Sequence, residues 1–92
     1  MAYSRWSFSD WYVFWHTSNA RRKEDELLAV WHVGVDEDSL PVYRYMDVVA
    51  MLTANDLSRI PGYKPEDHDF LVGIFKKWVA DVDKWYEQER DS

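Results

Sequence analysis

The chain has 92 residues, no cysteine and a net charge of −6, and 47% of its residues are hydrophobic. This length suffices for one domain, placed at residues 1–92, and the composition is unlike that of disordered chains. The absence of cysteine excludes a disulfide framework, a thiolate nucleophile and a Cys-based zinc site, and fits a reducing, cytoplasmic compartment. No apolar run is long enough to span a bilayer, and the N-terminus lacks a signal-peptide pattern, so we expect no membrane partner.

The first third of the chain predicts antiparallel strands. Residues 3–9 alternate large and small side chains, which indicates a short edge strand or an ordered arm laid across the sheet. Residues 11–17 are almost all aromatic or β-branched, so they predict a strand that is apolar on both faces. Residues 27–34 predict a second strand, and the polar connection before it is short enough for an antiparallel hairpin.

The register of this hairpin decides which residues share a face. We align Thr17 with Leu27, because large side chains then oppose small ones on one face. The other face then carries Tyr12, Phe14 and His32. A shift of one residue would exchange the two faces.

The second half of the chain predicts helices. Residues 42–44 could form a short third strand. Helical spacing begins at Tyr45, with a first helix at 45–52 that could extend to Arg59. Residues 65–89 form a second helix of about 37 Å, which begins at a proline followed by acidic residues.

The long helix is strongly amphipathic, and its apolar face is expected to cover the sheet. The residues of that face are Phe70, Leu71, Ile74, Phe75, Trp78, Val79, Val82, Trp85 and Tyr86. Strands followed by helices predict an α+β fold: a small two-layer domain in which an antiparallel sheet, either the two-stranded hairpin alone or the hairpin with a third strand, packs on two helices.

The sequence gives little support for catalysis. No nucleophile lies in a Gly-flanked turn, and His16, His32 and His68 show no metal-ligand spacing. Asp81 and Asp83 fall on different faces of the long helix. We therefore expect no metal, no cofactor and no enzymatic activity, and keep a small enzyme of unknown reaction as a third hypothesis.

The aromatic strand provides the main functional hypothesis, because its second face needs a cover. An arm containing Trp6 and Phe8 could supply it within the chain. Otherwise Tyr12, Phe14 and His32, together with Trp6 and Phe8, form a surface for another protein or for a second copy in a homodimer.

The first hypothesis is therefore a small protein-binding protein of the accessory, inhibitor or immunity type. In this hypothesis Asp36, Glu37 and Asp38 steer the approach of a basic partner.

The alternative is a module that binds single-stranded nucleic acid. In that case bases would stack on the aromatic sheet, and Arg21, Arg22 and Lys23 would hold phosphates. The net negative charge and the acidic residues that follow this basic run argue against nucleic acid as a partner.

Overall fold

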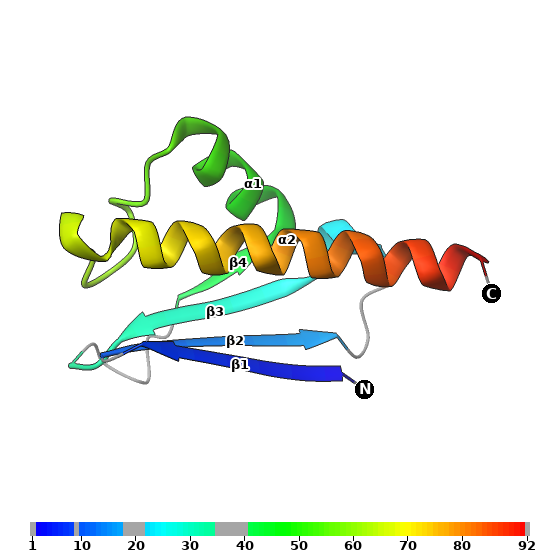
Figure 1. Ribbon diagram of the computed structural model, residues 1–92, viewed down its shortest axis with the longest axis horizontal. Helices are drawn as coiled ribbons and strands as arrows, with labels where there is room; N and C mark the ends of the chain where they lie inside the picture. Colours follow the sequence, from blue (N-terminus) through cyan, green and yellow to red (C-terminus); the bar gives the residue numbers. More distant parts are fainter. Residues whose placement is uncertain (1, 9, 18–21, 35–40, 92) are drawn as a thin grey trace.

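The computed structural model describes residues 2–8, 10–17, 22–34 and 41–91, without the side chains of residues 2–8, 16, 17 and 89–91. Four antiparallel strands form one sheet in the order β1-β2-β3-β4. Two helices lie together on one side of this sheet (Figure 1), so the α+β prediction is confirmed. The elements are β1 (Ala2–Phe8), β2 (Trp11–Thr17), the 3₁₀ turn η1 (Lys23–Asp25), β3 (Leu27–His32), β4 (Val42–Arg44), α1 (Tyr45–Ala54), the 3₁₀ turn η3 (Pro65–Asp67) and α2 (His68–Asp91).

The N-terminal segment forms the edge of the sheet. All seven residues of β1 pair with β2, from Ala2 opposite Thr17 to Phe8 opposite Trp11. The edge-strand prediction is therefore confirmed, and an arm that crosses the face of the sheet is wrong. The strand cannot cover that face, because its backbone is hydrogen-bonded within the sheet.

The first helix is shorter than its longest predicted form. It begins after Arg44, whose backbone N–H donates to a carboxylate oxygen of Asp47 at 3.2 Å. It ends at Ala54, because Asn55 adopts a left-handed conformation with φ 52°. The predicted extension to Arg59 is therefore wrong.

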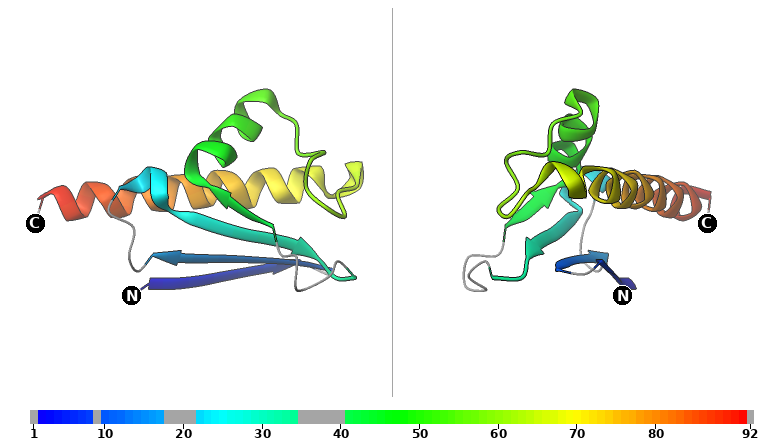
Figure 2. Two further views of the ribbon diagram at one scale, coloured as in Figure 1. Left: turned by 180° about the vertical axis from the view of Figure 1, so that it is seen from behind. Right: turned by 60° about the vertical axis from the view of Figure 1, so that its left-hand side comes forward.

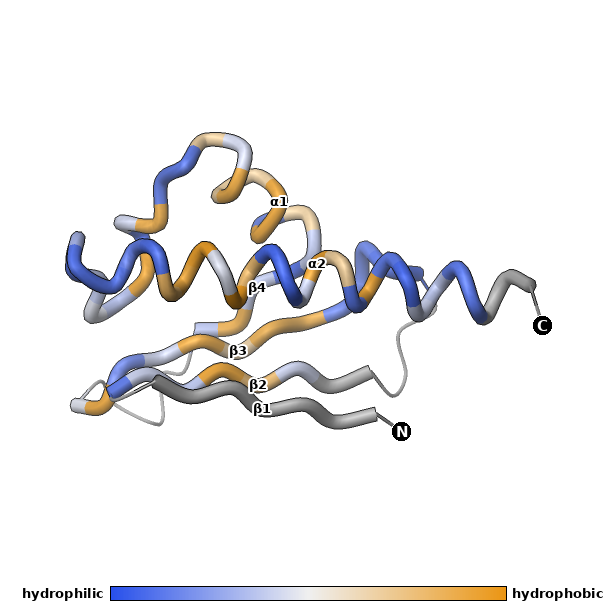
Figure 3. Tube along the Cα trace, viewed as in Figure 1, coloured by the Kyte–Doolittle hydropathy of each residue, from blue (hydrophilic) through white to orange (hydrophobic). Residues whose placement is uncertain are grey.

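The long helix covers the sheet as predicted. Pro65 begins the 3₁₀ turn η3, and the α-helix follows from His68. Hydrophobic residues recur along α2 between hydrophilic ones (Figure 3), and Leu71, Phe75, Trp78 and Val82 are completely buried. Among the helices that the structure describes, none has the length and apolar character to cross a membrane.

The core lies between α2, α1 and one face of the sheet, which we call the inner face. Trp11, Val13 and Trp15 of β2 point into it, and the rings of Trp15 and Trp78 meet edge to face at 6.5 Å. Large aromatic side chains of this kind bury roughly 150–250 Å² each. The other buried hydrophobic residues of the core are Leu28, Val30, Tyr43, Tyr45, Val48, Met51, Leu57, Ile60 and Ile74.

The predicted register of the hairpin is wrong by one residue. Trp11 pairs with His32, Val13 with Val30 and Trp15 with Leu28. Leu28 and Val30 consequently fill the space under α2, while residues 29 and 31 point to the opposite face. Because side chains alternate along a strand, this shift moves His32 to the inner face and Trp31 to the outer one.

Candidate functional site

The face of the sheet opposite the helices, here called the outer face, is the candidate site. Both helices lie on the same side of the sheet in every view (Figure 2), and the chain that the structure describes has no element across the other side. From the pairing of β2, β3 and β4, the described side chains of the outer face belong to Tyr12, Phe14, Leu27, Ala29, Trp31, Val42 and Arg44.

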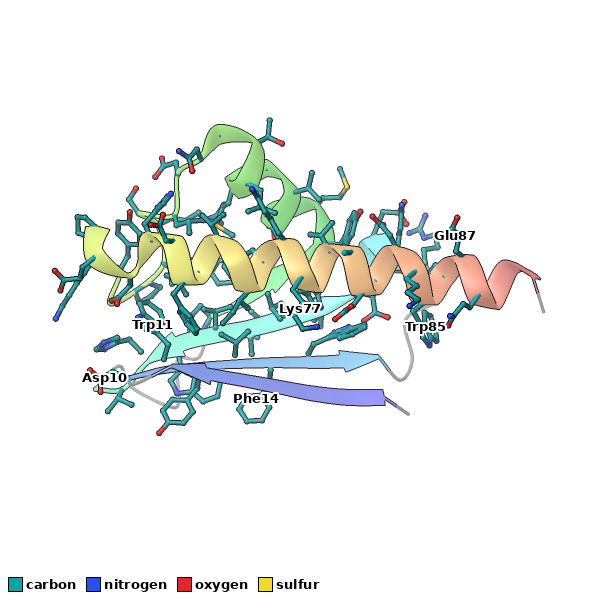
Figure 4. The ribbon with its side chains drawn as sticks, in the orientation of Figure 1. Asp10, Trp11, Phe14, Lys77, Trp85 and Glu87 are labelled. Atoms are coloured by element: carbon teal, nitrogen blue, oxygen red, sulfur yellow. The ribbon has the colours of Figure 1, made fainter. Side chains whose placement is uncertain are left out.

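An aromatic cluster forms the centre of the outer face. The indole of Trp31 stacks against the ring of Phe14, with centroids 5.3 Å apart and planes within 5°, and against the ring of Tyr12 at 5.4 Å and 19°. Ala29 stands opposite Phe14 and leaves room for the indole. The side chain of Phe14 points away from α2 (Figure 4), so this cluster lies outside the core.

Exposed aliphatic residues continue the surface beyond these rings. Leu27 is 45% exposed and Val42 is 52% exposed, and Val33, directly after β3, is 48% exposed. The remaining exposed large hydrophobic among the described side chains is Met46 of α1, on the helical layer. Exposed apolar area is therefore concentrated on and beside the outer face, a pattern typical of binding surfaces.

The described side chains of the outer face carry little charge, although the protein is acidic. Among these side chains Arg44 is the one charged group, and it stands opposite Leu27. The described carboxylates lie in the turns, in η1 and along the helices, for example at Asp10, Asp47 and Asp81. Among the described side chains, the helical layer and the turns thus hold the carboxylates, and the outer face is mainly apolar with one cation.

The structure separates the predicted contact residues. Tyr12 and Phe14 lie together on the outer face, whereas His32 lies on the inner face, with its ring edge to face against Trp11 at 4.9 Å. The His32 ring donates from Nδ1 to the carbonyl of Val33 at 2.8 Å, and its Nε2 lies 4.0 Å from a carboxylate oxygen of Asp10. His32 is thus placed at the end of the core and not beside the aromatic cluster.

Trp6 and Phe8 pair through their backbones with Val13 and Trp11. The side chains of Trp6 and Phe8 lie outside the described residues, so their prediction as contact residues stays a prediction.

The acidic run 36–38 and the basic run 21–23 are the charged groups for which the sequence predicted a role in partner binding. Asp36, Glu37 and Asp38 lie outside the described residues, as does Arg21. Arg22 forms an ion pair with Asp25 at 3.6 Å on η1. Lys23 binds the carboxylate of Asp83 in α2 at 3.2 Å.

A buried polar cluster beneath α2 is absent from the sequence-based prediction. Glu26 is 1% exposed; one carboxylate oxygen accepts from the indole N–H of Trp15 at 2.8 Å, and the other from the hydroxyl of Tyr86 at 3.3 Å. Nearby, the hydroxyl of Tyr45 donates to Asp83 at 2.8 Å. The cluster ties η1 and α1 to the C-terminal half of α2, which extends past the end of the sheet (Figures 1 and 2).

Two tyrosines of this cluster hold their protons unusually strongly. Burial, together with the charge and hydrogen bond of Glu26, raises the pKa of Tyr86 from 10.0 to about 12. Burial and the hydrogen bond to Asp83 raise the pKa of Tyr45 to about 12 as well. The hydroxyls therefore act as donors that stabilise the two carboxylates, a structural role.

A second polar network fixes the connection between the helices. The ring of His68 lies 2.9 Å from the hydroxyl of Tyr63 through Nδ1 and 2.8 Å from Oδ1 of Asn55 through Nε2. Since an amide oxygen only accepts, Nε2 of His68 donates to Asn55, and the ring and the Tyr63 hydroxyl share the second hydrogen bond. No group of three or more His, Asp or Glu side chains is placed to hold a metal ion within the described part of the chain.

Fold and site together define a small α+β domain with helices on one face of its sheet and an apolar, aromatic surface on the other. Comparison with known protein families, with curated proteins and with solved structures found no match to this chain.

Proposed function

We propose that the protein acts by binding another protein through its outer face. The observation that carries this proposal is the concentration of exposed apolar side chains there. The stacked, partly buried rings of Tyr12, Phe14 and Trp31 share this face with Leu27 and Val42, which are about half exposed. Aromatic residues are enriched where proteins bind proteins, and those near the centre of an interface often dominate the binding energy.

The proposed partner presents an apolar and nearly uncharged surface. Arg44 is the one charge among the described side chains of the outer face, so docking on that part of the face buries little charge. A partner chosen mainly for basic charge would instead meet the helical layer, which holds the described carboxylates. Affinity in this proposal comes from burial of apolar area, with ionic strength as a minor influence.

Binding of single-stranded nucleic acid is the second candidate, because the aromatic cluster of the outer face resembles a platform for bases. The described cations of the 21–23 run do not favour it. Lys23 binds Asp83 in α2, on the helical side of the sheet, and Arg22 pairs with Asp25. Gel shifts at increasing salt separate the two functions, since phosphate binding weakens steeply with ionic strength while apolar docking does not.

Site-specific photo-cross-linking tests the proposed function. A photoreactive phenylalanine derivative replaces Val42 on the outer face in one variant and Met46 on α1 in a matched control, because both side chains are about half exposed. In extract of the native host, position 42 is expected to give discrete protein adducts that position 46 does not give. Equal labelling from both positions, or none from position 42, would contradict the proposal.

A further inference from the structure

We draw no further inference here: the strongest candidate, the aromatic cluster of Tyr12, Phe14 and Trp31 on the outer face of the sheet, belongs to the site already described, and nothing in the structure shows what covers it.

Discussion

The indole of Trp31 lies parallel to the ring of Phe14 across the β2–β3 pair, with 5.3 Å between the ring centroids. Both side chains project from the sheet on the side away from the helices. This relationship defines the outer face, because it places three neighbouring aromatic rings outside the hydrophobic core.

The stacking should be measurable as a coupling energy. In a double-mutant cycle with Phe14→Leu and Trp31→Leu, we expect the two substitutions to interact by about 0.5–1.5 kcal/mol, the usual value for an aromatic pair. Urea unfolding supplies the free energies. Phe14→Leu combined with Met46→Leu, which lies on another layer, serves as control and should be additive. Additivity of the Phe14 and Trp31 changes would show that the rings do not stack.

The stability of the protein should depend on the carboxylate of Glu26. The substitution Glu26→Gln replaces one accepting oxygen with an amide donor, which then faces the indole N–H of Trp15 or the hydroxyl of Tyr86. We expect a loss of about 1–3 kcal/mol in the free energy of unfolding. Glu24→Gln removes the same charge from an exposed position on η1 and should change stability by less than about 0.5 kcal/mol. Equal effects of the two substitutions would argue against the buried cluster.

Two glycines should respond to alanine with opposite signs. Gly62 has φ +85°, and an added Cβ would lie 2.5 Å from Cβ of His32, so Gly62→Ala should destabilise the protein by about 1–3 kcal/mol. Gly73 lies within α2 with nothing within 4 Å of an added Cβ, so Gly73→Ala should stabilise it by about 0.5–1 kcal/mol. Thermal unfolding of both variants checks the pair. If Gly62→Ala leaves the stability unchanged, the turn at residues 61–63 does not pack closely against His32.

High pH should weaken the attachment of α2. The pKa of Tyr45 and that of Tyr86 are raised from 10.0 to about 12 in the folded protein, since burial and carboxylate neighbours favour the neutral hydroxyl. Their contribution to stability is therefore complete below pH 10 and is lost as the pH rises toward 12. Stability should fall in that interval, and a spectrophotometric titration should show Tyr45 and Tyr86 among the late-ionising tyrosines, together with Tyr43, whose pKa is also raised by burial.

Tyr45→Phe and Tyr86→Phe should each remove one late-ionising group from that titration. If every tyrosine ionises near pH 10 while the protein stays folded, the hydroxyls of Tyr45 and Tyr86 are not hydrogen-bonded to Asp83 and Glu26.

The elements of the fold could be predicted from local pattern, and the pairing between them could not. The aromatic run of β2 and the spacing of Leu71, Phe75 and Trp78 in α2 identify their own secondary structure. The register depends on which residues fit beneath α2, and that is decided by tertiary packing. Since Leu28 and Val30 fill that space, Trp31 faces outward.

The candidate site could be predicted only in part, because its composition also depends on how the strands pair. Tyr12 and Phe14 are two residues apart in one strand, so they share a face whatever the register of the hairpin, and their prediction did not depend on it. Trp31 was missed and His32 was misplaced, because their face depends on the pairing of two strands. Glu26 gave no signal in sequence, since it follows Glu24 and Asp25 in what reads as a solvated charged loop. Leu28 and Val30, two large apolar residues on the same face of β3, were the available indication of the correct register, because they fill the space under α2 better than Ala29 does.

The orientation of Trp31 is the central claim, and two-dimensional NMR tests it most directly. Nuclear Overhauser effects from the indole protons of Trp31 are expected to the ring protons of Phe14 and Tyr12. Effects from the Trp31 indole to Trp78 or Phe75 of α2 would instead place that side chain in the core and remove the outer face as a binding surface.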